Sequence, residues 1–225
     1  MTEILPDRLA RLIDITLLTG IHKPPPDDDN IQGCAMEVLS WLVGAPWSDH
    51  HDCVCPTLAA FVRSWNDGLN DDDRNTILKP LIPALVNTRG SNALDERRSM
   101  MAADWLIRVH TPAWLRLAKL DAHADALEAL PEITSQEQMP AIQSLINAAR
   151  RDAAAARAAA GAAAWASTRV AAGDAAWAAA WAAARAAAGD ALEPTKRYLQ
   201  ASARELLERM IGVEEIQSMR ENTKC

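Results

Sequence analysis

The sequence has few aromatic residues other than tryptophan: it contains eight Trp but only one Tyr and one Phe, at Tyr198 and Phe61. Bulky packing must therefore come mostly from indole rings. The sequence also lacks any convincing alternation of apolar and polar residues, which is the pattern of half-buried strands. Its long apolar patterns instead repeat with the period of a helix. We therefore predict an all-α protein.

The chain has neither an excess of positive charge nor a long, strongly apolar run free of charges. A net charge of -7 and a pI near 5.2 argue against a nucleic-acid-binding surface, which needs clustered Lys and Arg. No stretch has the apolarity of a membrane span. The first 20 residues carry Glu3, Asp7 and Asp14 instead of the cationic start of a signal peptide. We expect a cytoplasmic protein without nucleic-acid or membrane partners.

Common motifs of enzymes are also missing. There is no glycine-rich phosphate loop, no HExxH and no GxSxG. The four cysteines, three of them between Cys34 and Cys55, do not resemble the disulfide framework of a secreted protein. Enzymatic activity is therefore not the leading expectation.

The most distinctive stretch runs from Ala148 to Leu192 and consists largely of alanine, the residue with the highest helix propensity. A straight helix of this length would measure about 65 to 70 Å. A compact body of this chain length has a diameter of only about 45 Å. We therefore predict that the helix bends or breaks near 167–173, where Ser, Thr, Val and Gly interrupt the alanines.

Three tryptophans punctuate this alanine-rich stretch: Trp165, Trp177 and Trp181. On a helix, Trp177 and Trp181 share a face with Val170, whereas Trp165 points nearly the opposite way. Because Trp is a frequent anchor of protein interfaces, the three are candidate interaction residues. The alternative is that they pack within their own chain.

The remaining patterns predict roughly eight helices in a multi-helix bundle. The clearest candidates are 3–19, 34–43, 56–65, 93–110 and 113–130, a proline-interrupted segment at 77–83, and a helix between Pro194 and Gly212. Ser135 and Gln138 have the spacing of a capping box. We expect three parts: a helical core bundle at 1–130, an alanine-rich helical arm packed against it at 131–212, and a flexible tail at 213–225.

The loop from Pro46 to Pro56 and the nearby Cys34 contain the residues best suited to chemistry. Cys34, His50, Cys53 and Cys55 could together hold zinc, which binds four thiolate or imidazole ligands. However, C-x-C beside H-H matches a structural zinc site less well than C-x2-C would. The simpler alternative is a buried Cys34 and a solvated loop. Cys53 or Cys55 acting as a nucleophile with His50 as base would require a spatial arrangement that the sequence does not show.

Residues 34–69, CAMEVLSWLVGAPWSDHHDCVCPTLAAFVRSWNDGL, are followed by LKPLIP and a tail rich in Trp and Ala. This combination resembles hypothetical proteins of actinobacteria and their bacteriophages, with PWSDH and RSWNDGL as its most particular parts. The resemblance implies a bacterial or phage cytoplasmic origin, and it implies no catalytic residues.

Two functional hypotheses follow from these patterns. The first is a non-enzymatic helical interaction or structural protein, whose alanine-rich arm packs on its own bundle, on a second copy or on another protein. The second is a zinc protein, structural or hydrolytic, centred on Cys34 and the loop 49–55.

Overall fold

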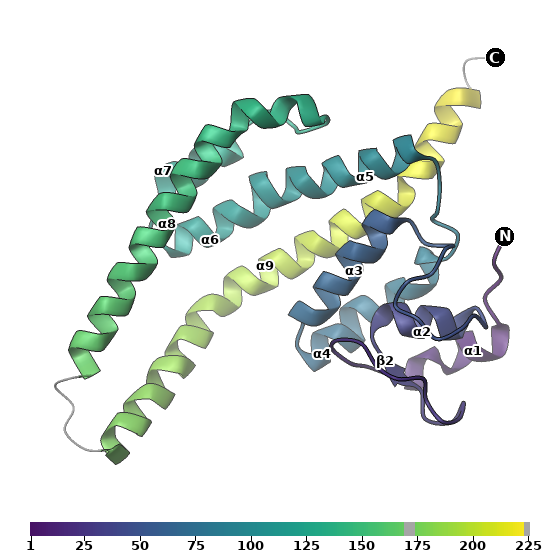
Figure 1. Ribbon diagram of the computed structural model, residues 1–225, viewed down its shortest axis with the longest axis horizontal. Helices are drawn as coiled ribbons and strands as arrows, with labels where there is room; N and C mark the ends of the chain where they lie inside the picture. Colours follow the sequence, from purple (N-terminus) through teal and green to yellow (C-terminus); the bar gives the residue numbers. More distant parts are fainter. Residues whose placement is uncertain (169–173, 223–225) are drawn as a thin grey trace. The chain divides into compact units, whose positions relative to one another are not determined.

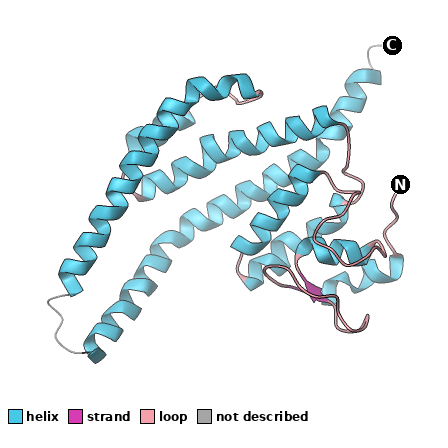
Figure 2. Ribbon diagram, in the orientation of Figure 1, coloured by secondary structure: helices cyan, strands magenta, loops and turns pink. Residues whose placement is uncertain are grey.

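The computed structural model describes the backbone of residues 1–168 and 174–222, and the side chains of residues 1–158 and 189–213 (Figure 1). The chain is 69% helical, with one pair of two-residue strands among the described residues (Figure 2). The predicted all-α, multi-helix fold is confirmed.

The chain forms two compact units. Unit 1 comprises Met1–Ser99 together with Arg204–Cys225, and unit 2 comprises Met100–Ala203. The boundaries of these units differ from the predicted parts 1–130, 131–212 and 213–225. The C-terminal part of the last helix belongs to the same unit as the N-terminal half of the chain.

Unit 1 is built around α2 (Ala35–Leu42), a helix in which every residue is buried. Helices α1 (Pro6–Arg11) and α3 (Pro56–Gly68) pack against it. The predicted helices at 34–43 and 56–65 are thus confirmed. They were predictable from the sequence because each has a strong apolar pattern and a proline or a glycine at a boundary.

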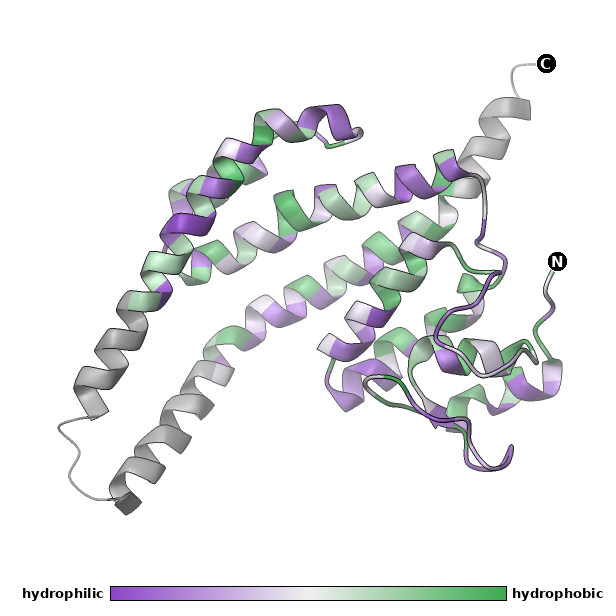
Figure 3. Ribbon diagram, in the orientation of Figure 1, coloured by the Kyte–Doolittle hydropathy of each residue, from purple (hydrophilic) through white to green (hydrophobic). Residues whose placement is uncertain are grey.

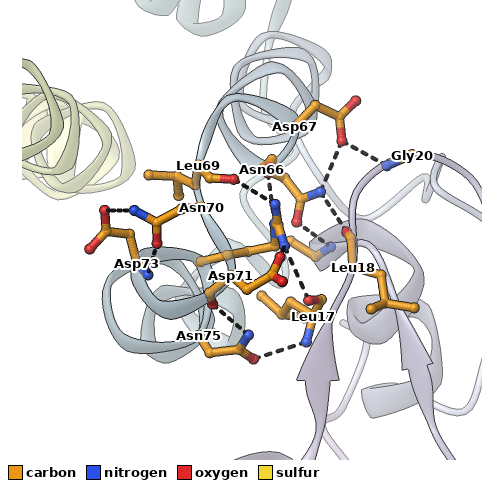
Figure 4. Close-up of polar contacts among 12 residues, drawn as sticks. Leu17, Leu18, Gly20, Asn66, Asp67, Leu69, Asn70, Asp71, Asp73 and Asn75 are labelled. Carbon is orange, nitrogen blue, oxygen red and sulfur yellow. Dashed lines mark hydrogen bonds and ion pairs between the residues drawn. The ribbon is translucent and has the colours of Figure 1, made fainter. Parts of the chain in front are cut away.

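The predicted helix at 3–19 is wrong beyond its first half. Helix α1 ends at Arg11, a 3-10 turn η1 follows (Leu12–Asp14), and β1 (Thr16–Leu17) then pairs in parallel with β2 (Gln32–Gly33). Side chains that are distant in sequence hold this segment extended. Figure 4 shows Asn75 and Asn66 reaching Leu17 and Leu18: the Asn75 Oδ1 accepts from the Leu17 amide at 2.9 Å, and the Asn66 Nδ2 donates to the Leu18 carbonyl at 2.9 Å.

The proline-interrupted segment is irregular, as expected. It consists of α4 (Asp71–Asp73), the π-helical η2 (Arg74–Leu78) and the 3-10 helix η3 (Lys79–Leu85), with Pro80 and Pro83 inside η3. A proline lacks the amide hydrogen that an α-helical bond needs, so the chain adopts tighter turns instead.

Unit 2 contains the end of α5 (Asn92–Trp105), the π-helical η4 (Leu106–His110), α6 (Thr111–Leu117), α7 (Asp121–Glu128) and η5 (Gln136–Gln138). Its core cluster consists of Leu115, Ala124, Leu127 and Ala149. The capping box of Ser135 and Gln138 is confirmed.

The single helix predicted at 113–130 is wrong. Helix α6 ends before Lys119, which has a φ of 60°, and α7 begins at Asp121. The amide of Leu120 turns back to the carbonyl of Leu115 at 2.9 Å. This closed turn lets both helices contribute to the same core cluster, an outcome that depends on contacts between helices and not on local propensity.

The alanine-rich tract forms two helices, α8 (Met139–Thr168) and α9 (Asp174–Asn222). The predicted bend or break at 167–173 falls largely on residues 169–173, which lie outside the described residues. Helix α9 continues through both Pro194 and Gly212, so the predicted helix start and end there are wrong. Apolar and polar residues alternate in bands along its described part (Figure 3). No helix among the described residues is long and apolar enough to cross a membrane.

Candidate functional site

Cys34, the first predicted metal ligand, caps the N-terminus of α2. Its side chain accepts a hydrogen bond from the backbone of Glu37, and the Glu37 carboxylate accepts one from the Cys34 amide at 2.8 Å. Burial, together with the neighbouring Glu37 carboxylate, raises the pKa of the Cys34 thiol to about 12. The thiol is therefore protonated at neutral pH and plays the part that a serine or threonine usually takes in a capping box.

Glu37 also holds His22, which lies between β1 and β2. The fully buried carboxylate accepts from the His22 amide at 2.6 Å and lies 3.0 Å from the His22 Nδ1. The indole of Trp47 donates to the His22 carbonyl at 3.0 Å. A Cβ at Gly33 would lie 2.7 Å from the Trp47 ring, so only glycine allows this close approach. Glu37 lies three residues after Cys34, which is the spacing of a capping box, so its role at the N-terminus of α2 could have been predicted from the sequence.

Cys55 occupies the N-cap of α3, but its partner is on another helix. Its buried thiol donates to the Asp95 Oδ1 at 2.9 Å, and the Thr57 amide donates to the same oxygen at 3.2 Å. Burial and the bond to Asp95 raise the pKa of the Cys55 thiol. Burial opposes ionisation of Asp95, but the bonds from Cys55 and Thr57 outweigh it and lower the pKa of this carboxyl. Asp95 thus acts as the anion at the N-terminus of α3.

Next to Asp95 on α5, the side chain of Arg98 is fully buried. Its Nε donates to the Met210 carbonyl at 2.8 Å, and its Nη1 donates to the Thr88 carbonyl at 2.6 Å. The Nη2 has no hydrogen-bond partner among the described residues. Arg98 therefore fastens the C-terminal part of α9 to the N-terminal half of unit 1.

The other two predicted ligands lie apart from these helix caps. His50 is exposed, with its Nδ1 2.7 Å from the Asp49 carboxylate, and Cys53 is half-buried. Among the described residues, no group of three or more His, Cys, Asp and Glu is placed to hold a metal ion. The structure does not bring Cys34, His50, Cys53 and Cys55 together as one ligand set, and zinc binding stays a prediction.

Unit 2 contains an open groove of about 480 Å³ beside α9. One wall carries Val109, Ala113 and Leu117, and the other carries Pro194 and Tyr198. At its rim, Arg116 is already paired with carboxylates: its Nη2 lies 2.5 Å from Glu128 and 2.9 Å from Asp125. The groove is therefore lined by both apolar and polar side chains, and its Arg116 guanidinium is already paired.

The candidate interaction residues Trp165, Trp177 and Trp181 lie on α8 and α9, and their side chains are outside the described residues. The structure places their backbone in helices and says nothing further of them. Their role as interface anchors stays a prediction.

In comparisons with protein families, curated proteins and solved structures, nothing matches this chain. The bacterial or phage origin implied by residues 34–69 therefore stays a prediction too.

Proposed function

We propose that this chain is a non-enzymatic helical interaction protein, and that the alanine-rich stretches of α8 and α9 bind a second copy of the chain. The observation that carries the proposal is the length of α8 beyond its described contacts with the core of its own unit. Among the described side chains, Ala153 is the last one of α8 packed against the core cluster of unit 2, and the helical backbone continues for 15 residues to Thr168. These 15 residues span about 22 Å of helix.

The described residues at the start of the alanine-rich stretch of α8 and at the end of that of α9 are consistent with an uncovered surface. On α8, Ala154, Ala155 and Ala158 are exposed, and on α9 both Asp190 and Ala191 are exposed. Alanine-faced helices gain by approaching one another to about 8 Å, because each methyl group buries little area. Tryptophans between them supply the larger apolar area that an interface needs.

A second copy is the occupant that the sequence of these stretches favours. The segments RAAAGAAAWAST (157–168) and RVAAGDAAWAAA (169–180) are near repeats of each other. Two copies of the chain would therefore bring together surfaces with the same spacing of small and bulky residues. Isologous pairing of this kind is the commonest route to a dimer.

The cysteines and the buried carboxylates support a non-enzymatic reading. A thiolate, not a thiol, is the reactive species of cysteine. Cys34 and Cys55 both have raised pKa values; the Cys34 thiol caps α2, and the Cys55 thiol donates to Asp95. Glu37 accepts hydrogen bonds from two backbone amides. These groups hold unit 1 together.

The test is Trp177→Ala, with molar mass measured by light scattering and stability measured by thermal melts. We expect the wild type to self-associate, and the variant to be monomeric with a nearly unchanged melting temperature, since removal of an interface anchor leaves the monomer intact. As a control, Trp105→Ala removes an indole that is 8% exposed and bonded to Ser202 at 2.8 Å. The control should lose about 3 to 5 kcal/mol of stability.

Two results would contradict the proposal. One is a wild-type protein that stays monomeric across the concentrations at which such dimers form. The other is a Trp177→Ala variant that loses about as much stability as Trp105→Ala while its association is unchanged, because Trp177 would then pack within its own chain.

A further inference from the structure

Helix α9 contains two residues that weaken a helix within a single turn and a half, and both lie in its described part. Pro194 is inside the helix, where it has no amide hydrogen to give to the Asp190 carbonyl and where its ring crowds that carbonyl. Gly189 is five residues earlier, and it has the poorest helix propensity after proline. The helical ladder is therefore weakest between these two positions.

The surroundings of this segment leave it room to move. A Cβ at Gly189 would have no heavy atom within 4 Å. Pro194 is exposed and lines the open groove of about 480 Å³, opposite Val109 and Ala113. Close packing is what normally keeps a helix straight through a defect, and here it is missing on these sides.

From Leu199 on, α9 is packed within unit 2. Leu199 is 7% exposed and Ala203 is 2% exposed. Between them, the Ser202 hydroxyl accepts a hydrogen bond from the indole of Trp105 at 2.8 Å. By contrast, residues 190–191 and Pro194 are exposed, and so are residues 196–198. The packed part of α9 therefore begins only at Leu199, beyond the weakened turn.

We infer that residues 189–194 form a hinge in α9, about which the alanine-rich limb 174–188 moves relative to the anchored limb 199–203. The hinge would let the alanine-rich limb change direction while the packing around Leu199 stays intact. The inference goes beyond the proposed function, since the hinge is a property of the chain whether or not a second copy binds the limb.

Backbone hydrogen exchange on the full-length protein tests the hinge. In the wild type, we expect the amides of residues 190–198 to exchange far faster than those of residues 199–203, because local opening exposes them without unfolding the unit. Pro194→Ala restores the missing bond to Asp190 and relieves the crowding. It should slow exchange at residues 190–198 roughly a hundredfold.

Two further variants sharpen the test. Gly189→Ala adds a methyl group into open space, and it should slow exchange in the same segment roughly fivefold. The control, Glu193→Ala, removes the exposed ion pair with Arg197 at 3.1 Å without restoring a backbone bond. It should change exchange less than threefold.

The hinge is refuted if residues 190–198 of the wild type exchange as slowly as residues 199–203. It is also refuted if Pro194→Ala slows exchange equally over the whole chain, because that result reports global stabilisation. Either outcome is independent of the molar mass measured by light scattering, so failure of the hinge and failure of self-association are distinguishable.

Discussion

Two arginines of unit 1 are buried to nearly the same extent but are bonded differently. Arg74 donates to the carbonyls of Asn66 at 2.8 Å and Leu69 at 2.5 Å, and it forms an ion pair with Asp71 at 2.6 Å. Arg98 has no carboxylate within ion-pair distance among the described residues, and one of its nitrogens lacks a partner. A buried charge is tolerated only when it is paired and fully hydrogen-bonded, so Arg98 is the less favourable of the two.

This difference predicts which of two substitutions, Arg74→Met or Arg98→Met, lowers the free energy of unfolding more. Arg74→Met leaves four acceptors without their donor, three backbone carbonyls and the Asp71 carboxylate, and should cost about 3 to 5 kcal/mol of unfolding free energy. Arg98→Met also strands acceptors, but it removes an unpaired nitrogen as well, and should cost only about 1 to 3 kcal/mol. Urea melts of both variants measure the order. Arg197→Met, at an exposed position, is the control and should change stability by less than about 0.5 kcal/mol. A larger loss for Arg98→Met than for Arg74→Met would contradict the assignment of partners.

At the scale of a single element, α3 is capped from outside its own sequence. Its N-cap residue Cys55 makes no side-chain cap bond, and Pro56 follows directly. The carboxylate that satisfies the Thr57 amide belongs to Asp95, on α5. Helix α2, by contrast, is capped within four residues by Cys34 and Glu37. The free amides at the N-terminus of α2 are therefore bonded by residues of the same segment, whereas those of α3 are bonded by a residue distant in sequence.

Because the group that caps α3 is the Asp95 carboxylate, the stability of the protein should depend on pH, and Asp95→Asn should remove this dependence. The pKa of Asp95 is lowered in the folded protein, so its contribution to stability is present above the unfolded value of about 3.8 and is lost as the pH falls through the folded value. We expect Asp95→Asn to be destabilised by about 0.5 to 2 kcal/mol at pH 7. The difference from wild type should shrink below pH 4.

Urea melts between pH 3 and pH 7 measure this difference. Glu96→Gln is the matched control, because Glu96 is the exposed neighbour of Asp95 and carries the same charge. A destabilisation of Asp95→Asn that persists unchanged at pH 3 would show that the Asp95 carboxylate does not cap α3.

For the whole molecule, metal content separates the two functional hypotheses. The Cys34 thiol caps α2, the Cys55 thiol donates to Asp95, and His50 is paired with Asp49. Both thiols have raised pKa values. Zinc would need both thiols as thiolates and would have to displace these bonds. We therefore expect chelator to leave the melting temperature unchanged.

Elemental analysis and thermal melts with and without chelator check this expectation. About one equivalent of zinc, together with a melting temperature that falls on chelation, would establish the predicted site at Cys34, His50, Cys53 and Cys55. The Cys53→Ser variant adds a control: its half-buried thiol makes no cap, so it should matter only if metal is bound.

Local interactions are the part of this protein that the sequence alone determined. Helix propensity and apolar period predicted α2, α3 and the helical state of the alanine-rich tract. The proline before Thr57 and the Ser135–Gln138 capping box marked boundaries correctly. The sequence also identified the reactive side chains between Cys34 and Cys55, because residue type needs no knowledge of the fold.

Only the tertiary structure decided where those side chains bond and where local preference is overruled. Residues 16–17 are extended because Asn75 and Asn66, about 50 to 60 residues away in the chain, bond their backbone. Cys55 is a donor to Asp95, 40 positions later, and not a ligand beside Cys34. Helix α9 continues through Pro194, and beyond it Trp105, 97 positions earlier, bonds Ser202. In each case a contact between distant parts of the chain outweighs a local preference of about 1 to 3 kcal/mol, and no local pattern in the sequence encodes such a contact.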